Sequence, residues 1–307
     1  MADRAFITGI SGFIGRALAA RLTERGLSVA GLAHTAAEVA GCRVNAGEIV
    51  HPAAYAPDLA RAQLVVHLAA PTTAQQITAH PLECMKTNWR GTSNVLDCFR
   101  GGEGSHFVLI SSGKVYGRPQ QLPINEDHPL RPQTVLGKSK LASEDLVRFY
   151  AEHCAGKRFT ILRLFNAYGP GQKPAFLIPT ILQQADKAEI KLGDISSRRD
   201  FIYIDDVIEA ILTVLFNSRD PAGSDSSVRI FNAGSGVSHS PEDIVHLLEE
   251  VAGRKLSIVS DWKLVRSGEA EEERADISKL LALGWAPRMD LKNGLERTWR
   301  AFSYAGR

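Results

Sequence analysis

Cysteine is scarce in this sequence, and its four copies lie far apart. Cys42, Cys84, Cys98 and Cys154 have neither the paired spacing of a zinc site nor the density of a disulfide-rich secreted domain. The pattern argues against a cysteine-bound metal and against a disulfide scaffold. We therefore expect no metal site, and we expect the protein in the cytoplasm.

Neither sign of charge is in large excess, and long basic or apolar runs are missing. The 36 Lys and Arg residues against 34 Asp and Glu give a formal net charge of +2 at pH 7. This balance argues against nucleic acid or an anionic membrane surface as a partner. The first apolar segment, residues 5–7, is short and leads directly into a glycine-rich stretch, so we expect neither a signal peptide nor a membrane span.

What the sequence does contain is an alternation of short β-rich runs with longer helical segments. It begins with a strand at 4–8, a helix at 13–25 and a strand at 28–33. Such alternation predicts an α/β fold with a Rossmann-like, doubly wound parallel sheet. The other strands expected in this sheet are 63–68, 106–110, 159–164 and 229–233, and the other helices expected beside it are 92–100, 141–154 and 201–216.

Beyond residue 166 the pattern changes to segments punctuated by proline and glycine, with helices expected at 178–187, 241–252 and 291–302. We expect a smaller C-terminal lobe there that binds the substrate. The first lobe, which contains the parallel sheet, is then assigned to 1–165 and 198–236, and the second lobe to 166–197 and 237–307. The chain thus crosses between the lobes more than once.

A glycine-rich loop joins the first strand to the first helix. It reads Thr8-Gly9-Ile10-Ser11-Gly12-Phe13-Ile14-Gly15. Glycines at this place permit a tight turn and let a pyrophosphate approach the helix N-terminus. The spacing resembles the Thr-Gly-x-x-Gly-x-x-Gly loop of the short-chain dehydrogenase/reductase superfamily. We therefore expect dinucleotide binding by Gly9, Gly12, Phe13, Ile14 and Gly15.

The end of the second strand bears on the choice between NAD and NADP. An acid there binds the ribose 2′-hydroxyl and repels a 2′-phosphate, but this sequence has Ala33 followed by His34 and Thr35. We favour NADP over NAD, with His34 and Thr35 as candidate phosphate contacts. By resemblance to the superfamily, Glu48 and Ile49 take the place of the acidic and apolar pair beside the adenine.

Several later motifs make the resemblance closer. They are His67-Leu68-Ala69-Ala70, Asn88 with Gly91-Thr92, Ser111-Ser112, Val115-Tyr116-Gly117, Arg163 to Pro170, Arg199-Asp200-Phe201, Asp205-Asp206-Val207 and Leu283-Gly284-Trp285. Together they resemble the extended short-chain dehydrogenase/reductases, the NAD-dependent epimerase/dehydratase family that modifies nucleotide sugars. The resemblance implies cofactor contacts from Leu68, Ala69, Ala70, Asn88, Ser111 and Lys140.

One catalytic position departs from that family. Its members use a tyrosine four residues before a lysine to exchange a proton with the sugar, and a nearby hydroxyl orients the sugar oxygen. Lys140 matches the lysine and Ser112 the hydroxyl, but the tyrosine position is Leu136. Losing the phenol removes a rate factor of about 10² to 10⁴ unless another group donates the proton.

Three nearby residues are candidate substitutes, and each has a plainer interpretation. Tyr116 is usually structural in relatives with the Val-Tyr-Gly motif. Lys114 stands where sugar 4,6-dehydratases have a glutamate, so it could reach the sugar, although a solvated lysine is the plainer and favoured interpretation. Thr134 is a poor proton donor and more plausibly contacts a sugar hydroxyl. The pair Gly113-Lys114 supplies no carboxylate, so we disfavour a 4,6-dehydratase.

A nucleotide-diphosphate sugar requires cations for its two phosphates, and Arg199 and Arg266 are the candidates by resemblance. Either could instead form a surface ion pair. Asn166 resembles an asparagine that binds the diphosphate or the adjoining sugar. Phe176, Pro179 and Lys191 are expected to line the base.

The leading hypothesis is an NAD(P)-dependent oxidoreductase of a nucleotide-diphosphate sugar. A 4-keto-sugar reductase and a 4-epimerase both remain open, and the preference for NADP, which cells keep reduced, favours the reductase. The rival is a catalytically impaired protein that kept both pockets and lost the tyrosine. The resemblance also implies a homodimer, formed through the helices that begin near Pro81 and Leu141.

Overall fold

The core of the computed structural model is a seven-stranded sheet in which every neighbouring pair is parallel. The structure describes residues 3–185, 187, 189–217, 227–261, 264 and 270–305. The strand order is β10-β6-β5-β4-β1-β2-β3. The strands are β1 (Arg4–Thr8), β2 (Ser28–Ala33), β3 (Arg43–Ala46), β4 (Leu64–His67), β5 (His106–Ser112), β6 (Arg158–Leu164) and β10 (Val228–Ala233).

The order of this sheet reverses at β1. The chain adds β2 and β3 on one side of β1 and then returns to add β4, β5, β6 and β10 on the other. In doubly wound sheets the crevice at such a reversal, beyond the carboxyl ends of the strands, is where ligands bind. The topology therefore points to the loop after β1.

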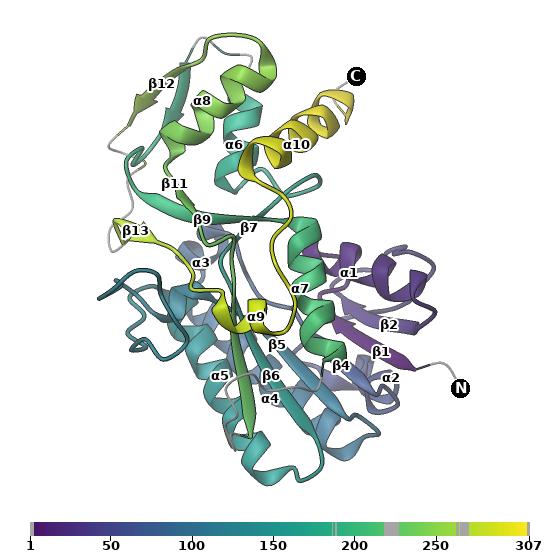
Figure 1. The fold of residues 1–307 in the computed structure, drawn as a ribbon. Coiled ribbons are helices and arrows are strands. Elements are labelled where there is room, and N and C mark those ends of the chain that lie inside the picture. Colours follow the sequence, from purple (N-terminus) through teal and green to yellow (C-terminus); the bar gives the residue numbers. More distant parts are fainter. Residues whose placement is uncertain are drawn as a thin grey trace.

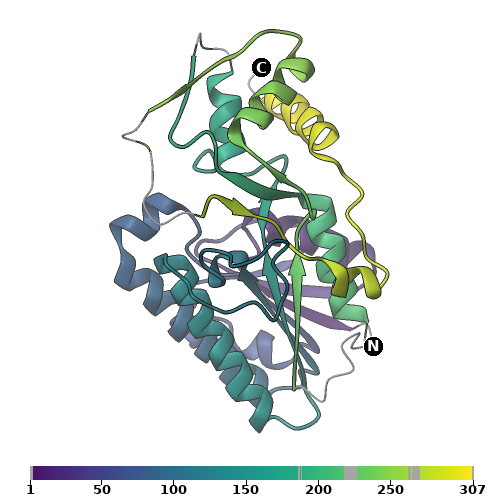
Figure 2. The same ribbon diagram turned by 60° about the vertical axis from the view of Figure 1, so that its left-hand side comes forward.

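Helices cover both faces of the sheet, as Figures 1 and 2 show. Alternate strand residues are buried on opposite sides: Ile7 packs in one core cluster with α1 and α7, and Phe6 packs in another with α4 and α5. These helices are α1 (Phe13–Glu24), α2 (Ala56–Ala60), α3 (Ala74–Ala79), α4 (Pro81–Gly101), α5 (Val135–His153) and α7 (Ile204–Phe216), with short 3₁₀ helices η1 (Pro52–Ala54) and η2 (Gly113–Val115).

Most of the remaining elements form the smaller C-terminal part, at the top of Figure 1. The remaining elements are α6 (Leu177–Gln184), α8 (Pro241–Ala252), α9 (Ser278–Ala282), α10 (Leu291–Ala305), β7 (Asn166–Tyr168), β8 (Glu189–Leu192), β9 (Arg198–Tyr203), β11 (Ser238–His239), β12 (Ser257–Ser260) and β13 (Glu272–Glu273). The short helix α9 instead packs beside β10 of the sheet. β9 is parallel to β7 and β13 and antiparallel to β11, whereas β8 pairs with β12. Segment 198–236, which the sequence assigned to the first lobe, contains both β9 and β10. Of these two strands, β10 lies within the seven-stranded sheet and β9 lies outside it.

Two buried carboxylates fix this part to the sheet. Asp200 on β9 is fully buried and accepts hydrogen bonds from the main-chain N–H groups of Ser235, Gly236 and Ala275. Asp206 at the start of α7 accepts from the N–H groups of the segment that leads into α10. The Asp-Phe and Asp-Asp motifs of the sequence are therefore structural ties that hold the second lobe over the sheet.

The predicted fold class is confirmed, and most predicted elements are present. The prediction of six strands in the main sheet was wrong, because β3 adds a seventh. α4 begins at Pro81, as the family resemblance implies, although the sequence pattern alone predicted a helix only from residue 92. α5 begins earlier than expected, at Val135. Among the described residues, no helix has the length and apolar character needed to cross a membrane.

Candidate functional site

The glycine loop lies at the reversal point of the sheet, between β1 and α1. Gly9 has φ +73°, and a Cβ there would come within 3.1 Å of the Ala69 backbone. A Cβ on Gly15 would lie 2.2 Å from the Gly9 carbonyl oxygen, so neither position accepts a side chain without a shift. α1 then begins at Phe13, with Gly12 as its N-cap and no capping side chain. These residues fit a dinucleotide, because the loop leaves main-chain N–H groups at a helix N-terminus for a pyrophosphate.

The segment Leu68-Ala69-Ala70 runs beside this loop and is held there by Thr8. The Thr8 hydroxyl oxygen accepts hydrogen bonds from the main-chain N–H groups of Leu68 and Ala69, both at 3.1 Å. The end of β4 is thereby fixed against the loop after β1. The structure thus brings together these two predicted cofactor-binding segments.

At the end of β2, Ala33 is buried whereas His34 and Thr35 are exposed. Glu48 is also exposed, and Ile49 is buried in the core. Ala33 occupies the position at which an NAD-specific site carries an acidic side chain.

Sequence reasoning did not single out Arg16, which directly follows the third glycine of the loop. Its Nε donates to the Ser11 carbonyl oxygen at 3.0 Å, and its Nη1 donates to the Glu38 carbonyl oxygen at 3.2 Å. The guanidinium therefore bridges the glycine loop and the segment after β2. A basic residue immediately after the glycine motif was the available signal.

Lys140 lies in the interior, one turn after Leu136 on α5. Its Nζ donates to the Ile110 carbonyl oxygen at 2.8 Å, and burial lowers the pKa of Lys140 to about 8. Asn88 on α4 donates to the Ser139 hydroxyl at 2.7 Å, and its Oδ1 has no hydrogen-bond partner among the described residues. Leu136 is half-buried. The lysine, the asparagine and the leucine thus cluster at the start of α5.

The start of α5 packs on η2, the turn that carries Lys114. A Cβ on Gly137 would lie 2.4 Å from the Lys114 carbonyl oxygen, so this close approach depends on glycine. The Ser112 hydroxyl oxygen accepts a hydrogen bond from the Lys114 main-chain N–H at 3.2 Å. Ser112 and Lys114 are therefore placed next to the helix that holds Lys140.

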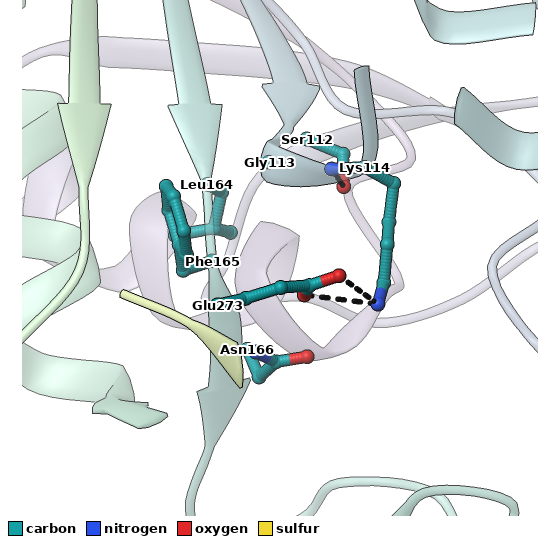
Figure 3. Close-up of a pocket in the computed structure, with 7 residues that line it drawn as sticks. All are labelled: Ser112, Gly113, Lys114, Leu164, Phe165, Asn166 and Glu273. Atoms are coloured by element: carbon teal, nitrogen blue, oxygen red, sulfur yellow. Dashed lines mark hydrogen bonds and ion pairs between the residues drawn. The ribbon is translucent and has the colours of Figure 1, made fainter. Parts of the chain in front are cut away.

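Figure 3 shows Lys114 facing a carboxylate that the sequence did not reveal as a site residue. The Lys114 Nζ lies 2.8 and 3.0 Å from the two carboxylate oxygens of Glu273 on β13. This ion pair borders a cavity of about 30 Å³, lined by Ser112, Gly113, Lys114, Leu164, Phe165, Asn166 and Glu273. Arg199 Nε lies 3.8 Å from Glu273 Oε2. The predicted residues Ser112, Lys114, Asn166 and Arg199 therefore meet around Glu273.

Tyr116 is not suited to donate a proton to a substrate, which corrects one of the sequence-based candidates. Its ring is fully buried, its hydroxyl donates to Asn232 Oδ1 at 2.6 Å, and that hydroxyl accepts from Arg163 Nη1 at 3.0 Å. Burial raises the pKa of Tyr116. Tyr116 is thus part of a buried network that also contains Glu144, which binds Arg163 through both carboxylate oxygens.

Two other predicted contacts are occupied by local hydrogen bonds. The Ser111 hydroxyl donates to Glu144 Oε1 at 2.6 Å and is buried, so a cofactor contact from Ser111 would have to come from its main chain. Thr134 is the N-cap of α5 and accepts from the Gly137 main-chain N–H at 3.1 Å. A sugar contact from Thr134 stays a prediction.

The residues expected to hold the base lie in the second lobe. Phe176 is the N-cap residue of α6 and is half-buried, Pro179 is buried in the first turn of that helix, and Lys191 is exposed on β8. Arg266, the second predicted diphosphate contact, lies outside the described residues. Their contacts with a nucleotide stay predictions.

Comparison with known proteins gives matches across nearly the whole chain. Residues 5–234 match the NAD dependent epimerase/dehydratase family. GDP-6-deoxy-D-mannose reductase of Pseudomonas aeruginosa is 32% identical over 312 residues, which cover 96% of this chain and 95% of that protein.

Solved structures are similar over a comparable length. UDP-glucose 4-epimerase of Thermotoga maritima with UDP-glucose has a TM-score of 0.86 at 25% identity, covering 99% of this chain and 100% of that one. UDP-glucose 4-epimerase of Thermus thermophilus in complex with NAD has a TM-score of 0.87 at 26% identity, covering 98% and 99%. The chain thus resembles proteins that bind NAD and nucleotide sugars.

Proposed function

The chain belongs to the NAD dependent epimerase/dehydratase family, and we propose that it reduces a 4-keto nucleotide-diphosphate sugar with NAD(P)H. Similarity to GDP-6-deoxy-D-mannose reductase along nearly the full chain supports the proposal. The observation that carries it is the Lys114–Glu273 ion pair beside Ser112, because it places an ammonium on the turn that packs against the start of α5, where Leu136 supplies no phenol.

The Lys114–Glu273 ion pair favours reduction of a sugar carbonyl over oxidation of a sugar hydroxyl. In a reduction, the carbonyl oxygen becomes an alkoxide and needs a proton, which an ammonium can give. Lys114 then loses an N–H bond as the sugar O–H bond forms, and the neutral amine regains a proton from solvent. The Lys114 ammonium donates hydrogen bonds to both carboxylate oxygens of Glu273, and an ammonium is a proton donor rather than the base that an oxidative first step requires.

Three further residues complete the site. NAD(P)H, when bound, supplies the hydride. We assign Lys140 to the cofactor ribose, because its Nζ lies at the carboxyl end of β5 near the glycine loop's edge of the sheet. Ser112 is assigned to the sugar oxygen, and Arg199 to the diphosphate, since a guanidinium can bind phosphate bidentately.

Two other activities are possible outcomes rather than our proposal. A 4-epimerase is supported by the overall similarity to UDP-glucose 4-epimerases. A binding protein without turnover is supported by Leu136. We continue to disfavour a 4,6-dehydratase, because Glu273, the one carboxylate among the described residues that line the cavity, is engaged by Lys114.

A turnover assay with a panel of 4-keto and ordinary nucleotide sugars separates these outcomes. We expect nicotinamide absorbance to fall in proportion to the 4-keto sugar consumed. Interconversion of two ordinary sugars without net loss of NAD(P)H would indicate the epimerase instead.

We propose NADP as the preferred cofactor. The buried Ala33 offers no charge against a 2′-phosphate, and the Arg16 guanidinium beside the segment after β2 supplies a cation near the expected adenosine ribose. His34 and Thr35 are exposed at the same place and remain candidate contacts.

Calorimetric titration with both cofactors tests this preference. We expect NADP(H) to bind at least as tightly as NAD(H), and Ala33→Asp to shift the preference toward NAD by adding a negative charge beside the 2′-phosphate. Ala33→Ser, which adds no charge, serves as the control. A strong preference of the unmodified protein for NAD would refute the assignment.

We propose a homodimer formed by α4 and α5, which lie side by side on one face of the sheet (Figures 1 and 2). Leu82 and Trp89 on α4 and Phe149 on α5 are large apolar side chains that remain exposed. Apolar surface on two adjacent helices is typical of a self-complementary interface.

Light scattering at micromolar concentration tests the dimer. We expect the mass of two chains, and we expect Trp89→Glu to halve it by placing a charge in the interface. Leu281→Glu changes an exposed leucine on α9, away from α4 and α5, and should leave the mass unchanged. A monomeric unmodified protein would count against the proposal.

We also propose the cytoplasm as the compartment. The structure has Cys42, Cys84, Cys98 and Cys154 as free thiols, as expected of a reducing environment.

A further inference from the structure

Glu273 contacts two cations, Lys114 and Arg199. The proposed function assigns proton donation to Lys114 and diphosphate binding to Arg199. The Glu273 carboxylate is 6% exposed and lies between Lys114, which comes from η2 of the first lobe, and Arg199, its neighbour on β9. A carboxylate this deeply buried is stable only when cations or hydrogen-bond donors surround it. The three side chains therefore form one group of two cations around one carboxylate, and Figure 3 shows Lys114 and Glu273 of this group at the edge of the cavity.

The two contacts of Glu273 are unequal. Both carboxylate oxygens lie within hydrogen-bonding distance of Lys114 Nζ, at 2.8 and 3.0 Å. Toward Arg199, the 3.8 Å separation from Nε is beyond a hydrogen bond. The contact with Lys114 is the stronger one, and the contact with Arg199 is the one that another anion can replace.

We propose that Glu273 is the internal counter-ion of the substrate site. It positions the Lys114 ammonium toward the sugar and releases Arg199 to the diphosphate when the nucleotide sugar binds. This inference rests on the proposed function, because it takes Arg199 as a diphosphate ligand. Glu273 is thus a positioning residue that acts through Lys114 and competes with the substrate for Arg199.

The competition predicts opposite effects on binding and on turnover. Removing the negative charge of Glu273 leaves Arg199 without this competitor and makes the site more positive, so a nucleoside diphosphate binds more tightly. The same change leaves Lys114 without the carboxylate that orients it, so kcat falls. A salt bridge with only a structural role would not tighten ligand binding when it is broken.

The neighbouring residue provides a matched control. Glu272 lies on the same short strand but makes different contacts: its Oε1 accepts from the Ser238 hydroxyl at 2.7 Å and lies 3.6 Å from Arg274 Nε. Glu272→Gln therefore removes a carboxylate charge from the adjacent residue without changing the contacts of Glu273 with Lys114 and Arg199.

The experiment is a calorimetric titration of GDP and of UDP into the full chain and its Glu273→Gln and Glu272→Gln variants, followed by steady-state kinetics. For the diphosphate that binds, we expect Glu273→Gln to lower Kd about fivefold or more, and Glu272→Gln to leave it unchanged. We expect kcat to fall about tenfold or more in Glu273→Gln while KM does not rise.

Unchanged or weaker diphosphate binding in Glu273→Gln would overturn the counter-ion proposal and leave the proposed function standing. If the unmodified chain binds neither GDP nor UDP, the titration is repeated with the thymidine, cytidine and adenosine diphosphates. If it binds none of the five, the proposed function fails and the counter-ion proposal fails with it. If Glu273→Gln does not fold, Lys114→Gln provides a second test. In that variant Glu273 can pair only with Arg199, so the Kd for the nucleoside diphosphate should rise about fivefold or more. An unchanged Kd in Lys114→Gln would also contradict the proposal.

Discussion

Replacing Lys114 with alanine is expected to lower the turnover of a 4-keto nucleotide sugar by about 10² to 10⁴ without changing the affinity for NADP. The reason is that Lys114 is the ammonium at the cavity beside Ser112, and Leu136 on α5 has no exchangeable proton. Steady-state kinetics at saturating cofactor measures the change in kcat, and calorimetry with NADP alone measures the binding.

Two further variants sharpen this prediction. Tyr116→Phe should keep turnover close to that of the unmodified protein, because the buried Tyr116 hydroxyl binds Arg163 and Asn232 and not a substrate. Leu136→Tyr, introduced into the Lys114→Ala variant, should restore turnover at least about tenfold, since it returns a phenol one turn before Lys140. In the unmodified protein the same substitution should add little.

The opposite pattern would change the assignment. If Lys114→Ala retains full turnover, Lys114 is not the proton donor, and water or the substrate itself must supply the proton. If only Leu136→Tyr produces turnover, in an otherwise inactive protein, the chain is an oxidoreductase that lost its activity with the tyrosine.

Replacing Arg199 with alanine is expected to weaken nucleotide-sugar binding by about 2 kcal/mol or more, which is roughly thirtyfold in Kd. Arg199 is buried on β9 next to the cavity, where a charge-assisted contact with a phosphate is strong because little water competes. Cofactor affinity should remain almost unchanged, since the glycine loop is at the other lobe. Arg266→Ala is expected to act in the same direction.

Arg198 gives the matched control for this measurement. It adjoins Arg199 on β9 but is more exposed, pairs with Asp243 and donates to the Ser238 carbonyl oxygen. Arg198→Ala should therefore leave nucleotide-sugar affinity nearly unchanged. Unaltered binding in both Arg199→Ala and Arg266→Ala would overturn the assignment of the diphosphate site.

Local sequence patterns were enough to predict most of the dinucleotide half of the molecule. The glycine loop, the strands at β1 and β2 and the helix between them depend on short-range preferences, so periodicity and glycine spacing identify them. β3 was missed because it is a four-residue strand, Arg43-Val44-Asn45-Ala46, with exposed ends and no apolar run. Its pairing with β2 is a tertiary effect.

The substrate half could be predicted only in part, because its contacts join distant segments. Glu273 lies 159 residues from Lys114, and nothing in its local sequence marks it as a partner. Tyr116 was weighed as a proton donor because its motif lies near Ser112, yet its partners Arg163 and Asn232 are 47 and 116 residues away. The proximity of Tyr116 to Ser112 in the sequence suggested a role as proton donor, but the burial of its hydroxyl argues against that role.

The most direct test of the account is the transfer of deuterium from nicotinamide to sugar. The native protein is mixed with deuterium-labelled NAD(P)H and a 4-keto nucleotide sugar, and the product is analysed by mass spectrometry. We predict a reduced sugar that carries one deuterium at the former carbonyl carbon. A protein that binds both ligands tightly but leaves the sugar unlabelled and unchanged would contradict the account and identify a binding protein.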